Sequence, residues 1–138
     1  MAYVQKTPCE VEEYLSQVTK ILAREEHVII NDDEWAEGHE NKTRTYMTEK
    51  NLKRVDIIKV LQDLKICNYS YTDEDRNKHF AGQEVWLFGS KQCMVDEMDE
   101  LYIKIKIVTL DDDYLKVMSF HPEKPLREED KLRFPYQK

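Results

Sequence analysis

Four side chains toward the C-terminal end of the chain suit chemistry on a phosphodiester. Tyr102, Lys104 and Lys106 alternate with isoleucines in one apolar segment. His121 ends the next strand-like segment. Successive side chains of a strand point to opposite faces, so the phenol and both ammonium groups are expected on one face of a sheet. There the ring can stack on a base while the lysines neutralise phosphate, and an imidazole suits general acid–base work.

Each of these features also has a plain structural explanation. Polar side chains alternate with apolar ones along any strand that has one face in solvent. A lone histidine at the end of a strand is commonly a surface or capping residue. The residue pattern alone therefore leaves both interpretations open.

A charged segment between the helical and strand-like parts adds Arg76 and Lys78 as candidate RNA contacts. A positioned cation stabilises negative charge that develops on a phosphate during cleavage. A solvated loop that balances its own acids explains the same composition. The four histidines show neither HxxxH nor HExxH spacing and the cysteines form no CxxC pair, so no metal and no other cofactor is expected.

Length and composition predict one small cytoplasmic domain. The chain has 138 residues, of which 41% are hydrophobic, enough for a single core. We expect no membrane span and no signal peptide, because apolar runs of the necessary length are missing. The three widely spaced cysteines suit free thiols in a reducing compartment.

Helical spacing dominates the first half of the chain. Thr7 and Glu10 predict a capping box with Pro8 at the first helical position, followed by an amphipathic helix to about residue 25. The other segments expected in this half are a strand at Val28–Ile30, a polar loop at 31–42, a strand or helix approach at Thr43–Met47, a helix from about Leu52 to Ile66 and a charged loop at 72–80.

The last third of the chain changes to strand-like alternation. The expected strands are Gln83–Phe88, Leu101–Leu110 and Tyr114–His121, separated by turns at Gly89-Ser90 and Asp111–Asp113. The aromatic residues of the C-terminal tail are expected to dock on the body. Helices followed by consecutive strands predict an α+β fold over residues 1–138, with N-terminal helices packed on a C-terminal antiparallel β-meander.

This order of segments resembles the MqsR-like toxins of bacterial type II toxin–antitoxin systems. The resemblance covers roughly Pro8 to Tyr136, and a strand containing Ser-Phe-His with a Pro-Tyr tail is similar to the Gram-positive branch. The residues that carry it are Val85-Trp86-Leu87-Phe88, Leu101-Tyr102-Ile103-Lys104, Met118-Ser119-Phe120-His121 and Pro135-Tyr136.

The resemblance implies a RelE-like fold and a metal-independent endoribonuclease that cleaves messenger RNA and is neutralised by a cognate antitoxin. In such enzymes the ribose 2′-hydroxyl attacks the adjacent phosphate. The catalytic tyrosine of the family falls on Tyr102, and its basic residue at the end of the following strand falls on His121. The candidate residues are therefore Tyr102, His121 and Lys104 for catalysis, and Arg76, Lys78, Lys106 and Trp86 for RNA binding.

Two departures from the family and the charge of the chain support an alternative. Ser70 or Tyr71 stands where family members can carry lysine, and Leu87 stands where some carry glutamine. The net charge of −7 is opposite to that of most nucleic-acid binders. The alternative is a non-enzymatic acidic inhibitor on the same fold, such as a phage-encoded blocker of a host nucleic-acid enzyme. In it, three acidic runs mimic phosphates: Asp32-Asp33-Glu34, Asp96-Glu97-Asp99-Glu100 and Asp111-Asp112-Asp113. Solubility explains the same acidic runs.

Overall fold

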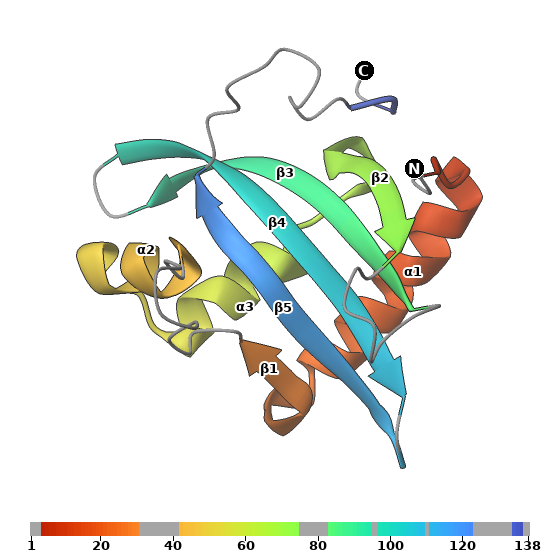
Figure 1. The fold of residues 1–138 in the computed structure, drawn as a ribbon, viewed down its shortest axis with the longest axis horizontal. Helices are drawn as coiled ribbons and strands as arrows, with labels where there is room; N and C mark the ends of the chain where they lie inside the picture. The colour runs from red at the N-terminus through yellow and green to blue at the C-terminus, as the bar shows by residue number, and fades with distance from the viewer. Residues whose placement is uncertain are drawn as a thin grey trace.

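The structure, a computed structural model, describes residues 4–30, 42–74, 83–94, 97–109, 111–122 and 134–136. Within these ranges the chain forms three α-helices and five strands (Figure 1). The helices are α1 (Pro8–Leu22), α2 (Lys42–Lys50) and α3 (Arg54–Gln62). The strands are β1 (Val28–Ile30), β2 (Tyr69–Glu74), β3 (Glu84–Met94), β4 (Glu97–Thr109) and β5 (Asp113–Pro122).

The five strands form one mostly antiparallel sheet in the order β1-β5-β4-β3-β2. Strands β2 to β5 are an antiparallel meander, whereas β1 adds to the edge of β5 in parallel. The predicted α+β fold is therefore confirmed. The predicted turn at Gly89-Ser90 is wrong, because β3 continues through it and pairs these residues with Tyr102 and Leu101 of β4.

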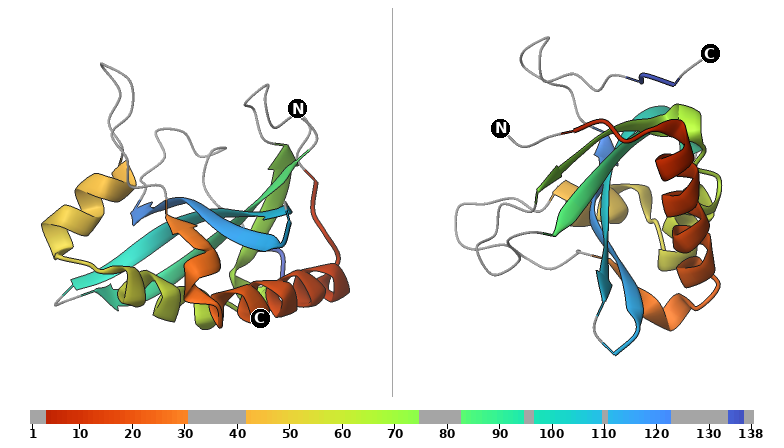
Figure 2. Two further views of the ribbon diagram at one scale, coloured as in Figure 1. Left: turned by 90° about the horizontal axis from the view of Figure 1, so that it is seen from below. Right: turned by 90° about the vertical axis from the view of Figure 1, so that its right-hand side faces the viewer.

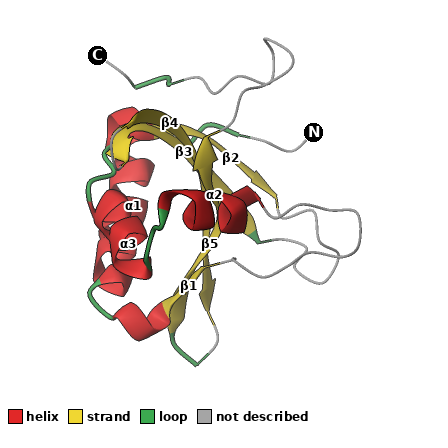
Figure 3. Ribbon diagram, turned by 90° about the vertical axis from the view of Figure 1, so that its left-hand side faces the viewer, coloured by secondary structure: helices red, strands yellow, loops and turns green. Residues whose placement is uncertain are grey.

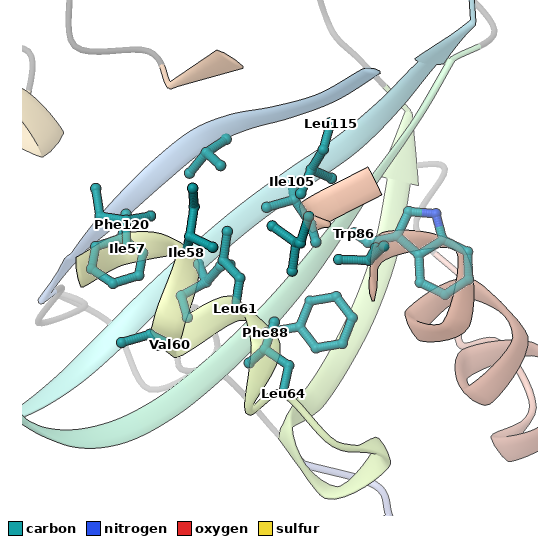
Figure 4. Packing of buried hydrophobic residues seen from close by; sticks show 14 of the residues in the cluster. Ile57, Ile58, Val60, Leu61, Leu64, Trp86, Phe88, Ile105, Leu115 and Phe120 are labelled. Atoms are coloured by element: carbon teal, nitrogen blue, oxygen red, sulfur yellow. The ribbon is translucent and has the colours of Figure 1, made fainter. Parts of the chain in front are cut away.

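Helices α1 and α3 cover one face of the sheet, as two further views make clear (Figures 2 and 3). Their apolar sides meet the isoleucines of β4 and the inward residues of the neighbouring strands in one hydrophobic cluster (Figure 4). The predicted capping box starts α1: the Thr7 hydroxyl accepts from the Glu10 N–H at 3.2 Å, and the Glu10 carboxylate accepts from the Thr7 N–H at 3.0 Å. Among the described elements, no helix covers the other face, which we call the open face.

Residues 43–47, predicted as a strand or an approach to a helix, lie in helix α2. This helix packs beside the C-terminal half of β5, just beyond the point where β1 stops pairing. There the Thr43 hydroxyl accepts a hydrogen bond from the Phe120 N–H at 3.0 Å, and the Tyr46 ring packs against the Phe120 ring. Helix α2 thus satisfies an edge amide that β1 is too short to reach.

The second sequence-predicted helix is shorter than expected, and β2 occupies part of the segment that was predicted as a charged loop. Residues 54–62 form α3, and a single 3-10 turn follows at Ile66–Asn68. The tyrosine of the C-terminal tail docks on the body, as predicted. Tyr136 stacks on Tyr69 with ring centroids 6.1 Å apart, and the Tyr136 hydroxyl donates to the Lys6 carbonyl. Of the polar loop predicted at 31–42, residues 31–41 lie outside the described residues, and Lys42 is the first residue of α2.

No described helix combines the length and apolar character needed to cross a membrane. The three cysteines are exposed and free, as the sequence predicted.

Candidate functional site

The pairing of β4 with β5 brings the two leading candidates together on the open face. Tyr102 and His121 are directly opposite partners in the ladder. Their rings stack at an interplanar angle of 28°, with centroids 5.8 Å apart. The phenol is partly exposed, whereas His121 is only 6% exposed. The sequence thus identified a tyrosine and a histidine that are spatial neighbours.

The backbone fixes the tautomer of His121. Its Nδ1 lies 3.0 Å from the Pro122 carbonyl oxygen. A carbonyl can only accept, so Nδ1 carries the proton in the neutral ring and Nε2 is the nitrogen that can take up another. The contact with Pro122 therefore selects the tautomer protonated on Nδ1 whenever the imidazole is neutral.

A β-bulge determines which face His121 occupies. Leu115 and Val117 point into the core, so strict alternation would send residue 121 to the core as well. The register shifts instead between Lys104 and Ile105, leaving Met118 as the extra residue of β5. Phe120 consequently faces the core, and His121 faces Tyr102 on the open side.

Lys104 lies one step along the open face from Tyr102. It is partly exposed and faces Ser119 of β5 on one side and Leu87 of β3 on the other. Tyr71 of β2 is the next partner beyond Leu87, so one row of side chains crosses four strands. The sequence analysis assigned no strand to Tyr71 and therefore did not identify it as part of this face; the alternation in Tyr69-Ser70-Tyr71 was the available signal.

Lys106 shares this face but its environment differs from the prediction. The residue is 1% exposed, and its ammonium group donates to the Gln83 side-chain oxygen at 3.0 Å. Its partner across the ladder is Lys116, a second cation. The Lys106 side chain is therefore buried, which corrects its predicted role as an exposed RNA contact.

Trp86 lies on the wrong face for the predicted site. It pairs with Ile105, a core residue, and is 6% exposed. Its ring stacks on Tyr14 of α1 with centroids 3.8 Å apart. The alternation of β3 and β4 separates it from Tyr102 by the thickness of the sheet, so Trp86 cannot join Tyr102 and His121 in binding one RNA strand.

The remaining predicted RNA contacts, Arg76 and Lys78, lie outside the described residues. Within the described part of the chain, no cluster of three or more histidine, cysteine or acidic side chains could hold a metal ion.

A second tyrosine–histidine pair stands at the other end of β5. His27 stacks on Tyr114 at 7°, with ring centroids 4.3 Å apart. Its Nδ1 lies 2.9 Å from the Asp113 carbonyl oxygen, and its Nε2 lies 3.0 Å from an Arg24 guanidinium nitrogen. Since the carbonyl requires a proton on Nδ1 and the guanidinium donates to Nε2, this ring is a neutral structural link.

Two of the acids predicted as phosphate mimics, Asp99 and Asp112, are paired with other side chains of the fold. Asp99 accepts from the Tyr46 hydroxyl at 2.6 Å and lies 3.9 Å from the Lys50 ammonium. Asp112 is paired with Arg24 at 2.7 Å. The hydrogen bond from the Asp113 N–H is the main cause that lowers the pKa of Asp112 below its ordinary value, and the hydrogen bond from the Arg24 guanidinium is the next.

Comparisons of the chain with models of protein families, with curated proteins and with solved structures found no match. The functional argument therefore rests on the geometry of the open face.

Proposed function

We propose that this protein is a metal-independent endoribonuclease that acts on messenger RNA from the open face of its sheet. The observation that carries the proposal is the direct pairing of Tyr102 with His121, rings stacked 5.8 Å apart, with Lys104 one step along the same face. An imidazole, a phenol and an ammonium group can supply the base, the acid and the positive charge that transesterification of RNA uses.

The groups divide the proton transfers between them. His121 Nε2 takes the proton of the ribose 2′-hydroxyl as its oxygen bonds to phosphorus. The bond to the 5′-oxygen breaks, and that oxygen receives a proton from the Tyr102 phenol, which is far more acidic than an alcohol. The products are a 2′,3′-cyclic phosphate and a 5′-hydroxyl.

The stacked geometry also suits the charges that appear during the reaction. The imidazolium formed at His121 lies against the ring of Tyr102, a favourable arrangement for a cation beside an aromatic face. Lys104 supplies positive charge for the phosphate oxygens as a second negative charge develops there. The proton on His121 then returns to the Tyr102 phenolate through water and resets the pair.

We further propose that the enzyme is a toxin whose activity a cognate antitoxin restrains, as the resemblance in the C-terminal strands implies. Indiscriminate cleavage of messenger RNA stops growth, so such an enzyme needs an inhibitor. The acidic-inhibitor alternative has weaker support, because Asp99 and Asp112 of its acidic runs pair with cations of the chain itself.

The experiment is cleavage of single-stranded RNA by the purified protein in excess EDTA, with chemical analysis of the new ends. We expect cyclic phosphate ends from the native protein, and no cleavage from the Tyr102→Phe/His121→Asn double variant. Asparagine keeps a donor near the Pro122 carbonyl but cannot act as a base. Cleavage by the double variant at the native rate, or cleavage that stops in EDTA, would refute the mechanism.

Induced expression separates the toxin part of the proposal from its chemistry. We expect growth arrest with the native chain and normal growth with the double variant. A matched control is the Tyr114→Phe/His27→Asn double variant, which alters the other tyrosine–histidine pair and should still arrest growth. Equal growth of all three strains would argue against a toxin.

A further inference from the structure

A groove on the helical side of the sheet has a chemistry unlike that of the open face. It lies between α1 and the strands β3 and β4 and encloses about 410 Å³. The side chains that matter for its chemistry are Lys6, Glu10, Glu13, Tyr14, Glu84 and Trp86. Figure 4 shows Trp86 beside α1 at the margin of the hydrophobic cluster.

The groove already holds one cation. The Lys6 ammonium lies 2.8 Å from the Glu84 carboxylate and 5.8 Å from the centroid of the Trp86 ring. The hydrogen bond to Glu84 is the main reason why the pKa of Lys6 is raised. An acid next to an aromatic face is an arrangement that attracts ammonium and guanidinium groups.

The acids outnumber this cation. Glu10, Glu13 and Glu84 line the groove against Lys6 alone. Glu10 caps the start of α1, and Glu84 pairs with Lys6. Glu13 forms no ion pair with any described residue and is exposed. The groove therefore repels phosphate and favours a second positive charge.

A buried polar group in the wall of the groove also lacks a partner. Tyr14 is 8% exposed, and its hydroxyl has no hydrogen-bond partner among the described residues. Burial, and to a lesser extent the carboxylate of Glu84, raises the pKa of this phenol, so it stays neutral. Tyr14 and Glu84 both line the groove. A buried hydroxyl is normally hydrogen-bonded. Its oxygen can accept from a donor that enters beside Glu84.

We propose that this groove binds an arginine side chain from a basic segment of a partner protein. The guanidinium would pair with Glu13 and Glu84, lie against Trp86 and donate toward the Tyr14 hydroxyl. Arginine fits better than lysine, because its planar fork makes several hydrogen bonds while stacking on an aromatic ring. The proposal does not depend on the nuclease, since the groove and the open face lie on opposite sides of the sheet.

The probe is a twelve-residue peptide of alternating arginine and alanine, and its control replaces every arginine with citrulline, which keeps the shape and removes the charge. Binding is followed by the fluorescence of Trp86 in a Trp35→Phe background. We expect saturable binding of the arginine peptide, and binding of the citrulline peptide weaker by about tenfold or more. Equal binding of both peptides, or no binding of either at millimolar concentration, overturns the proposal.

Substitutions in the protein test whether the groove, rather than the overall negative charge, binds the peptide. Glu13→Gln with Glu84→Gln should weaken binding about tenfold. Glu12→Gln changes an exposed neighbour on α1 outside the groove and should leave binding unchanged, and Lys6→Met should tighten it by removing the competing cation. An equal loss of peptide affinity in the Glu12 variant and the double variant would mean that the overall negative charge alone binds the peptide, and would refute the proposal.

Tetramethylammonium tests whether the groove binds any small cation instead. Tight binding of this ion would mean a small-cation site, and would also refute the proposal.

Discussion

The two tyrosine–histidine pairs at opposite ends of β5 have similar parts and different surroundings. Tyr102 and His121 stack at 5.8 Å on the open face, and His27 and Tyr114 stack at 4.3 Å beside β1. Both histidines are largely buried, and both have Nδ1 against a backbone carbonyl oxygen. Stacking and burial are therefore not what separates a catalytic candidate from a structural pair.

The two pairs differ in the charged groups that lie beside them. Nε2 of His27 accepts from the Arg24 guanidinium, so a proton added there would break that bond and set two cations against each other. His121 instead lies against the partly exposed Tyr102 on the face that carries Lys104. One pair thus holds an arginine, and the other is the pair for which we propose proton exchange.

Replacing the two histidines by asparagine is the sharpest test of this comparison. His121→Asn should lower the rate of RNA cleavage by about 10³-fold, the scale of a lost general base. His27→Asn should leave cleavage per folded molecule unchanged and destabilise the fold by about 2 kcal/mol, since it disrupts two partly buried hydrogen bonds. Single-turnover kinetics and thermal unfolding of both variants are the measurements. A similar loss of activity in both variants would show that the two histidines do not differ in their role in cleavage.

Replacing the two tyrosines by phenylalanine separates the hydroxyl from the ring. Tyr102→Phe keeps the ring against His121 but removes the proton donor, so we expect cleavage to fall about 10²-fold. Tyr114→Phe should have no effect on cleavage. An RNA substrate with a 5′-thio leaving group needs no protonation and should restore the rate of Tyr102→Phe; failure of that rescue would assign the phenol to positioning instead.

The role of Lys104 can be tested through its charge. Lys104→Met should reduce kcat/KM about 10²-fold by removing charge stabilisation of the phosphate. It should also reduce the slope of log affinity against log salt by about 0.7, the value for one phosphate contact on a single strand. Lys91→Met is the control, because Lys91 is an exposed lysine of β3 paired with Glu100. An unchanged salt slope in the Lys104 variant would exclude a direct phosphate contact.

The smallest effect is expected at the Asp112 carboxylate beside Arg24 and His27. Because folding lowers the pKa of Asp112, this group stabilises the fold above its unfolded pKa and loses that effect as the pH falls through the lower folded value. Asp112→Asn should therefore lower Tm at pH 7 and have little effect near pH 2. Thermal unfolding across this range, with Glu12→Gln as control, is the measurement; a constant Tm difference at every pH would exclude the linkage.

Local patterns predicted the elements whose signals lie in neighbouring residues. The capping box of Thr7 and Glu10 fixed the start of α1, and the alternation around Ile103 and Ile105 assigned the two faces of β4. The antiparallel order of the last strands followed from short connections. These signals are local, so one sequence contains them in full.

The errors came from segments whose structure depends on distant partners. Thr72–Glu74 is polar enough to suggest a loop, and becomes part of strand β2 because β3 pairs with it. Gly89-Ser90 suggests a turn, yet the long β4 strand keeps β3 extended. Thr43–Met47 alternates weakly and becomes helical beside the edge of β5. In each case tertiary pairing outweighed a weak local preference.

The sequence by itself determined the α+β class, the starting point of α1 and the phenol and ammonium groups on one face of β4. Only the tertiary structure decided that His121 joins them, because a bulge at Met118 reverses the alternation of β5. It also decided that Trp86 and Lys106 are buried. The physical reason is that strand alternation is a local property, whereas register and burial depend on which strands lie alongside.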